Sequence, residues 1–598
     1  MSTNSSASPT AVATSWLLHF GQALAQPDFV AAGLLFHTEC FWRDLVAFTW
    51  NIKTAEGPAA IQAMLTATVP PAAPTDWQLI GEATWEDGVI AACFTFETAL
   101  ARGQGHLRLK GGKCWTLCTT MTELKGFAEK KGERRVQGIA HGAFKQRRSW
   151  LELKEQEEAE LGYTRQPYCV IIGGGQGGIA LGARLRRLAV PTIIVEKNAR
   201  AGDSWRNRYK SLCLHDVIWQ NHLPYLPFPD DWPVFIPKDK MGDWLECYTK
   251  IMELNYWTST ECQSAHYDEA AGSWSVVVNR AGEEVILHPQ QLVLATGMSG
   301  MPNMPQIPGA ENFQGDLRHS SQYTAGACYR GKHCIVLGSN TSAHDICADL
   351  WEHDAEVTMI QRSSTLVAKS ETLFAGSRYS EASAQAGITT EMLDFLKETL
   401  PYKLQATQAI AAWEQIRLKD ADLYARLEKA GFLLDFGEDG SGIDMKYMRR
   451  GSGYYIDVGA SDLIAAGEIK LRSGVTIAQI KEQSVVLSDG SELPADLIVY
   501  ATGYGSMNSW AAKLISQEVA DKVGKCWGLG SATTYDPGPW EGELRNMWKP
   551  TQQPGLWFHG GNLRQSRYFS QLLALQIKAR LEGIATPVYE LATVHHLA

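Results

Sequence analysis

Two segments of the chain share one pattern of apolar and polar positions: a short apolar run, a glycine-rich turn, and then apolar residues at helical spacing. The first has the run Tyr168–Ile172, a turn at residues 173–178 and a helical pattern over residues 179–185. The second has the run His333–Leu337, a turn at residues 338–343 and a helical pattern over residues 344–350. Such short runs are typical of parallel strands buried on both faces. The pattern therefore predicts an α/β protein with two dinucleotide-binding, Rossmann-like domains.

The first turn matches the G-x-G-x-x-G fingerprint in the strand–turn–helix context that gives it meaning. Its glycines permit a tight turn, a close approach of the backbone to a diphosphate, and close packing of helix on strand. The helix start adds N–H groups and a positive dipole end. Glu196 ends the next predicted strand, near the spacing of roughly 20 residues expected for an acid that binds ribose; the alternative is a solvated surface glutamate. We assign to this nucleotide Gly173, Gly175, Gln176, Gly178, Glu196 and Lys197.

The second turn reads G-x-N-x-S-A and departs from the fingerprint at two glycines. Asn340 tolerates unusual dihedral angles better than most residues, and Ala343 is nearly as small as glycine, so a helix-capped anion site is still expected. The next predicted strand leads to Gln361 and Arg362 instead of an acid. A neutral Gln361 avoids repulsion and Arg362 can hold a 2′-phosphate, which favours NADPH, with NADH accepted if Arg362 stacks on adenine; the alternative is an arginine in a surface loop. The predicted binding residues are Gly338, Ser339, Asn340, Thr341, Ser342 and Arg362.

Between the two turns, residues 313–323 read FQGDLRHSSQY, which is F-x-G-x-x-x-H-x-x-x-Y. With a fingerprint on either side, this string makes the chain resemble the flavin-containing monooxygenases and the related Baeyer–Villiger monooxygenases over roughly residues 167–583. Tyr323 is similar to the former, because the best-known Baeyer–Villiger enzymes have Trp there. The long N-terminal extension and a histidine near the flavin resemble the bacterial type II branch, which oxidises ketones and often accepts either reduced nicotinamide.

The resemblance implies FAD in the first site and NADPH in the second. It also implies insertion of one atom of O2 through a flavin C4a-(hydro)peroxide, with Baeyer–Villiger oxidation of ketones to esters or lactones and also sulfoxidation. Alternatives are oxygenation of nitrogen or sulfur alone, a flavin oxidase or NADPH oxidoreductase that inserts no oxygen, and a non-catalytic flavin sensor. The absence of any C-x-x-C pair argues against a thioredoxin-reductase-like enzyme.

Three flavin contacts follow from the resemblance. Trp205 lies in G-D-S-W, which is similar to the G-G-x-W segment beside the flavin. Asn562 and Leu563 lie in GGNLRQS, which resembles the last flavin-contacting loop and helix.

Three further residues are candidates for catalysis. His215 stands where relatives carry Asn or Asp, and it is expected to donate to the peroxide or to orient water, unless it is a buried hydrogen-bonded residue. His319, in the intervening string, is implied to act in domain motion and nicotinamide placement; the alternative is a core histidine near a domain joint. Arg450 resembles the active-site arginine of Baeyer–Villiger enzymes and would favour an anionic peroxide, although a basic loop is an equal alternative.

The region before the first fingerprint has a different pattern. A helical segment is followed by alternating segments such as TWEDGVIAACFTFET, which predict antiparallel strands. This order is similar to the α+β cone of the nuclear-transport-factor-2-like and SnoaL-like proteins, so a role in dimerisation or in covering the active site is expected. Trp42, Arg43 and Asp44 are expected in an interface or core rather than in a cavity.

The predicted organisation has five parts. They are a disordered tail (1–10), the nuclear-transport-factor-2-like domain (11–125), a charged helical linker (126–166), an FAD-binding domain (167–315 and 465–598), and an NADPH-binding domain with a helical insertion (316–464).

Composition narrows the setting of these domains. The chain has 598 residues, which suggests several packed units, and its net charge of −10 argues against nucleic acid as a partner. No apolar run reaches the length of a membrane span, and the N-terminus lacks the pattern of a signal peptide. Twelve cysteines without a C-x-x-C pair fit a reducing cytoplasm. The expected partners are a small ketone or sulfide, O2 and a second copy in a homodimer, with no metal ion.

Overall fold

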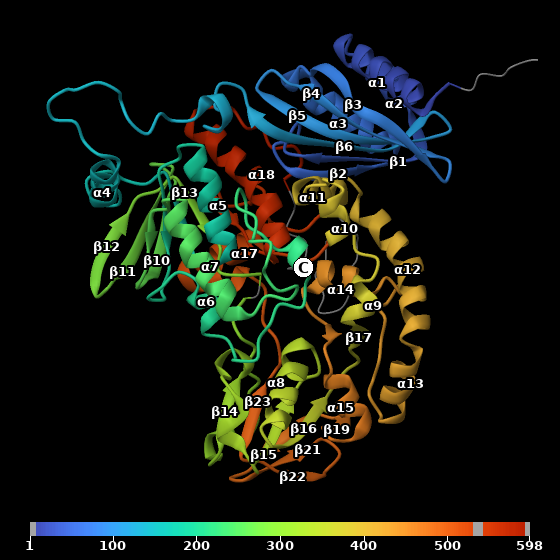
Figure 1. Ribbon diagram of the computed structural model, residues 1–598, viewed down its shortest axis with the longest axis vertical. Helices are drawn as coiled ribbons and strands as arrows, with labels where there is room; N and C mark the ends of the chain where they lie inside the picture. Colours follow the sequence, from blue (N-terminus) through green and yellow to red (C-terminus); the bar gives the residue numbers. More distant parts are fainter. Residues whose placement is uncertain (1–6, 299, 530–541, 592–598) are drawn as a thin grey trace, which may run out of the picture.

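The computed structural model describes residues 7–298, 300–529 and 542–591. The N-terminal domain lies at one end of the long axis and the second dinucleotide domain at the other (Figure 1). The first dinucleotide domain and a group of helices lie between them. Residues 1–6 of the predicted tail lie outside the described residues.

The N-terminal domain is a six-stranded sheet with helices packed on it. Its strand order is β2-β1-β6-β5-β4-β3, and β1 pairs with β6 in parallel whereas all other neighbours are antiparallel. Helix α1 begins at Pro9, capped by the Ser8 hydroxyl that accepts from Ala11 N, so the predicted tail of ten residues is too long. The elements are α1 (Pro9–Ala25), α2 (Phe29–Leu34), β1 (Phe36–Leu45), β2 (Ile52–Glu56), α3 (Gly57–Ala72), β3 (Thr75–Glu86), β4 (Val89–Glu97), β5 (Ala101–Lys110) and β6 (Lys113–Leu124).

The linker at residues 126–166 is mostly irregular, so the prediction of a helical linker was wrong for most of its length. Only α4 (Trp150–Glu160) is an α-helix, held at its start by a capping box between Ser149 and Glu152. Before it lie four glycines with positive φ, at residues 126, 132, 138 and 142. Because such backbone angles interrupt a helix and no residue of α4 is buried, the charged composition did not produce a longer helix.

The first dinucleotide domain contains a five-stranded parallel sheet in the order β24-β13-β7-β8-β9. The predicted runs are confirmed as strands, and β7, β8 and β13 are buried along their whole length. Two long helices, α5 and α18, pack against each other beside this sheet. The elements are β7 (Cys169–Ile172), α5 (Gln176–Arg187), β8 (Thr192–Val195), α6 (Asp203–Arg206), α7 (Lys238–Ile251), β9 (Tyr256–Trp257), β13 (Gln291–Leu294), β24 (Leu556–Phe558) and α18 (Leu563–Leu581), with a three-stranded sheet of β10 (Thr260–Asp268), β11 (Ser273–Arg280) and β12 (Glu283–Leu287).

The second dinucleotide domain has another five-stranded parallel sheet, in the order β14-β23-β15-β16-β19. The predicted return to the FAD-binding domain at residue 465 was wrong, because β19 and β23 pair within this second sheet. The error arose because a strand that ends in A-T-G occurs in both domains, at residues 292–297 and 497–503. The elements are β14 (Asp316–His319), β15 (His333–Leu337), α8 (Thr341–Glu352), β16 (Glu356–Gln361), α15 (Ala460–Ala466), β19 (Lys470–Ser473) and β23 (Leu497–Tyr500), with a hairpin sheet of β20 (Ile477–Ile480), β21 (Ser484–Leu487) and β22 (Glu492–Pro494).

A helical insertion follows the second nucleotide unit, as the helical patterns after residue 362 predict. It runs between the N-terminal domain and the second dinucleotide domain (Figure 1). No helix among the described residues is long and apolar enough to cross a membrane. The elements are β17 (Leu366–Lys369), α9 (Ser370–Phe374), α10 (Glu381–Gln385), α11 (Thr390–Glu398), α12 (Tyr402–Lys419), α13 (Ala421–Lys429), α14 (Gly442–Arg450) and β18 (Tyr454–Asp457), and α16 (Asn508–Leu514) and α17 (Gln517–Val523) follow later in the chain.

Candidate functional site

The three glycines of the first turn differ in the room that surrounds them at the start of α5. Gly173 has φ 107°, and a Cβ there would lie 2.4 Å from the carbonyl oxygen of Ala295. A Cβ on Gly178 would lie 2.0 Å from the carbonyl oxygen of Gly173. In contrast, a Cβ on Gly175 would meet only Ser204 Oγ, at 3.7 Å. Packing therefore requires glycine at two of these positions, and the third leaves room beside the helix N-terminus, which fits the diphosphate of a dinucleotide.

The acid at the end of β8 is held in place by backbone N–H groups. The Glu196 carboxylate is buried and accepts from Gly174 N at 2.9 Å and from Asn198 N at 2.8 Å. Oε1 accepts a second hydrogen bond, from Asn198 Nδ2 at 2.6 Å, whereas Oε2 accepts only from Gly174 N among the described residues. The carboxylate is thus not solvated, and Oε2 retains acceptor capacity toward a ribose hydroxyl. Lys197, next to it, is exposed. The Thr296 hydroxyl, beside the turn, is buried and has no hydrogen-bond partner among the described residues, as expected where a ligand supplies one.

The residues predicted to face the flavin ring come together at the start of α18. Gln176 Oε1 accepts from Trp205 Nε1 at 3.2 Å, and Gln176 Nε2 donates to the Gly561 carbonyl oxygen at 3.4 Å. Asn562 caps α18 by accepting from the backbone N–H of Gln565 at 2.9 Å, and Leu563 is the first residue of that helix. The structure therefore joins three segments that lie far apart in the sequence.

Tyr447, on α14, is a site residue that the sequence reasoning missed. Its hydroxyl donates to Gln565 Oε1 at 2.6 Å and accepts from Asn562 N at 3.2 Å. The tyrosine thus holds the capped end of α18 from the side of the insertion. In the sequence, only its position shortly before Arg449 and Arg450 could have marked Tyr447 as a site residue.

The second glycine turn has a similar geometry with different side chains. A Cβ on Gly338 would lie 2.3 Å from the carbonyl oxygen of Ala501. Asn340 is the N-cap of α8, with φ −93° and ψ −172°. This is an ordinary extended conformation, so the position does not require the tolerance of unusual dihedral angles that was expected of asparagine. Its side chain accepts from Thr365 Oγ1 at 3.3 Å, and the Ser339 hydroxyl pairs with the same threonine at 2.7 Å.

Two other residues of this turn lie on α8 itself. Thr341 is its first residue and donates from Oγ1 to the Tyr454 carbonyl oxygen at 3.0 Å, and the half-buried Ser342 follows.

The residues after β16 have separate roles. Gln361 is fully buried, donating to the carbonyl oxygen of Leu433 at 2.9 Å and accepting from its N–H at 2.8 Å. It therefore holds a backbone segment and is not available to a nucleotide. Arg362 is exposed. Its guanidinium is the group at this strand end that remains available for a 2′-phosphate.

His319 lies at the joint between the intervening string and the second A-T-G turn. Its Nε2 is 3.1 Å from the Gly503 carbonyl oxygen, its Nδ1 is 2.9 Å from Ser321 Oγ, and its ring makes an edge contact with Tyr504 at 5.1 Å. Burial lowers its pKa, and the hydrogen bond to Gly503 opposes that shift. The predicted role in positioning the second domain stays a prediction.

His215 lies in a loop of the first domain that docks on the second. In that loop Tyr209 Oη donates to Asp345 Oδ2 on α8 at 2.6 Å, and Lys210 N donates to the Thr324 carbonyl oxygen at 2.9 Å. Burial raises the pKa of Asp345, while the Tyr209 hydrogen bond and the charge of the half-buried His215 act to lower it. His215 therefore lies where the two dinucleotide domains meet.

Arg450 is the last residue of α14, close to the first A-T-G turn. Its Nη2 is 3.8 Å from Glu438 Oε1, and its side chain is 25% exposed. A Cβ on the following Gly451 would lie 2.4 Å from Cε of Met298, just after the first A-T-G turn. The arginine is therefore on an ordered helix end near this turn rather than in a basic loop.

Acid should destabilise the second dinucleotide domain through His344. Burial lowers the pKa of this α8 histidine to about 4, although hydrogen bonds to the backbone of Asn340 and Ser339 oppose the shift. Between a pH of about 6.5 and about 4, His344 is protonated in the unfolded chain but neutral in the folded chain. The free energy of unfolding therefore falls as the pH is lowered through that range. We expect thermal melting between pH 7 and 4 to show a loss of about 2–3 kcal/mol from this residue. His344→Gln should remove that part of the loss, and the exposed His266 is the control position; an unchanged pH profile in His344→Gln would contradict the assignment.

Two glycine turns, each between a parallel strand and a helix, define a protein with two dinucleotide sites. The sequence model of the flavin-binding monooxygenase-like family matches residues 196–523, more than half of the chain. The chain is 31% identical over 365 residues to indole-3-pyruvate monooxygenase YUCCA1 of Oryza sativa subsp. japonica, covering 60% of this chain and 83% of that protein. It is 32% identical over 348 residues to the probable indole-3-pyruvate monooxygenase YUCCA7 of Arabidopsis thaliana, covering 57% and 75%. The chain belongs to the flavin-binding monooxygenase-like family and is a flavin-containing monooxygenase.

A solved structure supports the fold. The ε-caprolactone-bound crystal structure of cyclohexanone monooxygenase in the loose conformation aligns with 70% of this chain and 88% of that one, with a TM-score of 0.50 and 17% identity. The predicted α/β fold class is thus confirmed.

Proposed function

We propose that the protein binds FAD at the first glycine turn and NADPH at the second, and inserts one oxygen atom of O2 into a ketone by Baeyer–Villiger oxidation, with sulfoxidation as a second activity. The observation that carries the proposal is the docking of the His215 loop on α8 through Tyr209 and Asp345. This contact joins a loop of the first domain to α8, the helix that follows the second glycine turn, and it supports an arrangement in which flavin and nicotinamide meet. When bound, the flavin supplies the activation of O2, and the protein supplies binding, orientation and exclusion of water.

The residues of the chain divide this work. The turn at Gly175 and the Glu196 carboxylate bind FAD, while Gln176 and Asn562 orient its ring end. Arg362 selects NADPH by its phosphate and leaves room for NADH with weaker binding. Among the other residues, His319 positions the second domain, His215 holds a proton toward the reacting oxygen, and Arg450 supplies positive charge.

Replacing His215 should uncouple reduced-nicotinamide consumption from oxygenation. In His215→Ala we expect the yield of oxygenated product per NADPH to fall by about tenfold or more, since a positioned proton donor typically contributes at least that much. Hydrogen peroxide should account for the difference, measured as peroxide released per NADPH oxidised. His266→Ala, at an exposed position of β10, is the control. Unchanged coupling in His215→Ala would leave His215 with a packing role alone.

The product of the reaction tests the proposed function directly. The purified yellow protein would be mixed with NADPH, O2 and a panel of a strained cyclic ketone, a thioether and a 2-oxo acid, followed by mass spectrometry. The 2-oxo acid is included because the two relatives are named for indole-3-pyruvate. An ester or lactone supports Baeyer–Villiger oxidation, whereas sulfoxide alone supports heteroatom oxygenation. Hydrogen peroxide with no oxygenated product would overturn the proposal in favour of an oxidase.

We also propose that the N-terminal domain is a nuclear-transport-factor-2-like, SnoaL-like cone, which the packing of α1 and α3 on its six-stranded sheet supports. A homodimer in the cytoplasm is proposed with it, and light scattering of the full chain tests the dimer. A monomeric mass would contradict it.

A further inference from the structure

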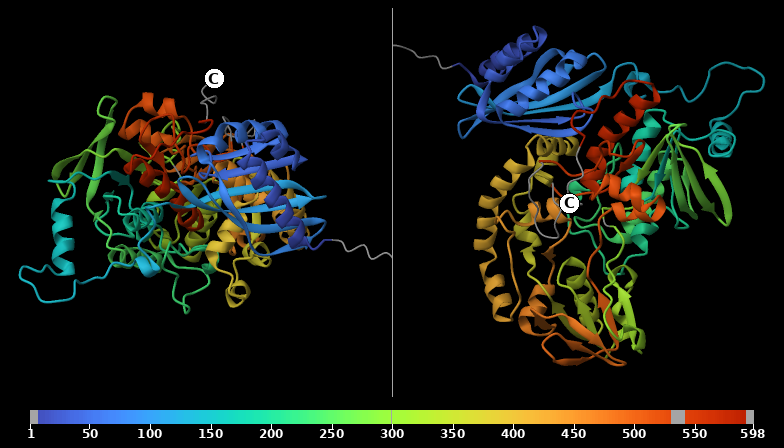
Figure 2. Two further views of the ribbon diagram at one scale, coloured as in Figure 1. Left: turned by 90° about the horizontal axis from the view of Figure 1, so that it is seen from above. Right: turned by 180° about the vertical axis from the view of Figure 1, so that it is seen from behind.

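Four charged side chains are buried together where the N-terminal domain meets the rest of the molecule. Arg43 comes from β1, Glu398 ends α11, Glu543 precedes β24 and Arg564 lies in the first turn of α18. Their exposed fractions are 0%, 0%, 4% and 3%, respectively. The views from above and behind show α18 running beside the N-terminal sheet (Figure 2), and α18 contacts both β6 and α11. This charged cluster thus connects two domains with the helix whose start carries Asn562.

Glu398 is the link between the two arginines of the charged cluster. Arg43 Nη1 donates to Glu398 Oε2 at 2.9 Å, and Arg564 Nη1 donates to the other oxygen, Oε1, at 2.6 Å. Burial alone would raise the pKa of Glu398, but the charges of Arg564 and Arg43 outweigh it and hold that pKa at about 2. The carboxylate is therefore charged and is shared between the domains.

Arg43 is fixed independently of Glu398. Its Nε and Nη2 donate to the two oxygens of Glu543, at 2.6 and 2.8 Å, and its guanidinium lies over the ring of Tyr402 at 4.4 Å. A planar fork held at two edges cannot turn without breaking a charged hydrogen bond. The N-terminal domain thus presents a rigid donor to Glu398, and Glu398 in turn presents a rigid acceptor to Arg564.

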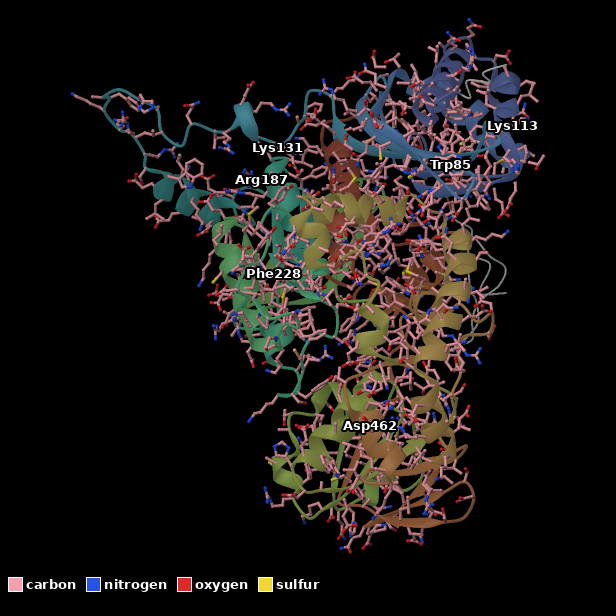
Figure 3. All side chains as sticks on the ribbon, turned by 45° about the vertical axis from the view of Figure 1, so that its right-hand side comes forward. Trp85, Lys113, Lys131, Arg187, Phe228 and Asp462 are labelled. Carbon is pink, nitrogen blue, oxygen red and sulfur yellow. The ribbon has the colours of Figure 1, made fainter. Side chains whose placement is uncertain are left out.

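Such a cluster is a poor source of stability, because desolvating four charges costs about as much as their pairing returns. The charged cluster instead fixes the relative positions of the side chains that it joins. Arg564 directly follows Leu563, and the same helix end is held from the other side by Tyr447. The start of α18 is therefore held by two residues of the insertion, Tyr447 on α14 and Glu398 on α11. The N-terminal domain reaches it through Arg43, which binds the same Glu398. The N-terminal domain lies outside the segment matched by the family. In Figure 3, Trp85 and Lys113 mark the N-terminal domain and Asp462 lies in the second dinucleotide domain, toward the opposite end of the molecule.

We propose that Arg43 is a positioning residue of the flavin site, acting through Glu398 on Arg564 to hold the start of α18 against the flavin. The inference rests on the proposed function in one respect, that Asn562 and Leu563 face the flavin. It makes the N-terminal domain part of the flavin site rather than a separate module.

A double-mutant cycle on the full chain tests whether Arg43 acts through Arg564. Arg43→Met, Arg564→Met and the double variant would be compared by the dissociation constant for FAD and by the reduction potential and visible spectrum of the bound flavin. We expect each single variant to weaken FAD binding by about fivefold or more and to shift the flavin spectrum, and the double variant to go no further than the stronger single one. Effects that multiply in the double variant would overturn the proposal. If Arg43→Met does not fold, Arg43→Lys keeps the charge but loses the fork, and the same cycle applies to it.

Arg108 provides the matched control. It lies on the same face of the N-terminal domain and its Nη2 donates to Thr399 Oγ1 at 3.0 Å, one residue from Glu398, with no link to Arg564. Arg108→Met should lower the melting temperature while leaving the flavin spectrum and FAD affinity unchanged. If Arg108→Met weakens FAD binding and shifts the flavin spectrum as much as Arg43→Met does, any loosening of the N-terminal domain affects the flavin site, and the specific role of Arg43 is overturned. These readouts do not require turnover, so a failure to oxygenate any substrate would count against the proposed function and not against Arg43.

Discussion

A Gly175→Ala variant should fold as well as the parent protein without flavin and yet bind FAD at least about tenfold more weakly. The new methyl group has room in the protein, since its nearest neighbour is Ser204 Oγ at 3.7 Å, and the backbone at φ −75° suits alanine. Without flavin the variant is expected to gain about 0.4–1 kcal/mol from the reduced entropy of the unfolded chain. In the presence of FAD, the methyl group fills space that the diphosphate needs. Charged hydrogen bonds to the diphosphate are then lost, and each contributes about 1.5–3 kcal/mol to binding.

The measurement is a titration of the flavin-free protein with FAD, paired with a melting curve of the same sample. Gly178→Ala is the matched control, because its Cβ would lie 2.0 Å from a carbonyl oxygen and should lower stability with or without flavin. Unchanged FAD affinity in Gly175→Ala would show that the diphosphate lies elsewhere.

An Arg362→Ala variant should discriminate between the two reduced nicotinamides. The exposed guanidinium at the end of β16 is expected to contact the 2′-phosphate, and a charged hydrogen bond contributes about 1.5–3 kcal/mol. The KM for NADPH should therefore rise about 10- to 150-fold, while the KM for NADH changes much less. Steady-state kinetics with both coenzymes at a fixed substrate concentration gives the comparison.

Arg330→Ala is the control for this prediction. Arg330 is also exposed, but it precedes β15 at the other end of the strands and pairs with Asp354. If the KM rises equally for NADPH and NADH in Arg362→Ala, Arg362 does not contact the 2′-phosphate, and the substitution acts on the domain as a whole.

The local parts of both dinucleotide sites could be predicted from the sequence. His333–Leu337 and Thr192–Val195 are strands with the predicted bounds, and α5 and α8 begin at the predicted turns. Continuous apolar runs and glycines at fixed spacing produce these units through contacts between near neighbours, so the signal lies within some twenty residues. The same locality explains two errors. Charge composition alone suggested a helix at residues 126–149, and the repeated A-T-G strand ending did not show which sheet received residues 470–500.

The tertiary structure decided which of these segments form one site. Tyr447 reaches the cap of α18 across 115 residues of sequence, and Arg43 reaches Glu398 across 355. Gln361, expected from the sequence only to avoid repelling a phosphate beside Arg362, is buried in the fold and holds the backbone of Leu433. The sequence by itself determined the glycine turns, the strands that precede them and the family, because each depends on residues that are neighbours in the chain. The position of the N-terminal domain against the start of α18 depends on the four buried charges of Arg43, Glu398, Glu543 and Arg564, which come from different segments of the chain. Only the packing of those segments brings the charges within hydrogen-bonding distance.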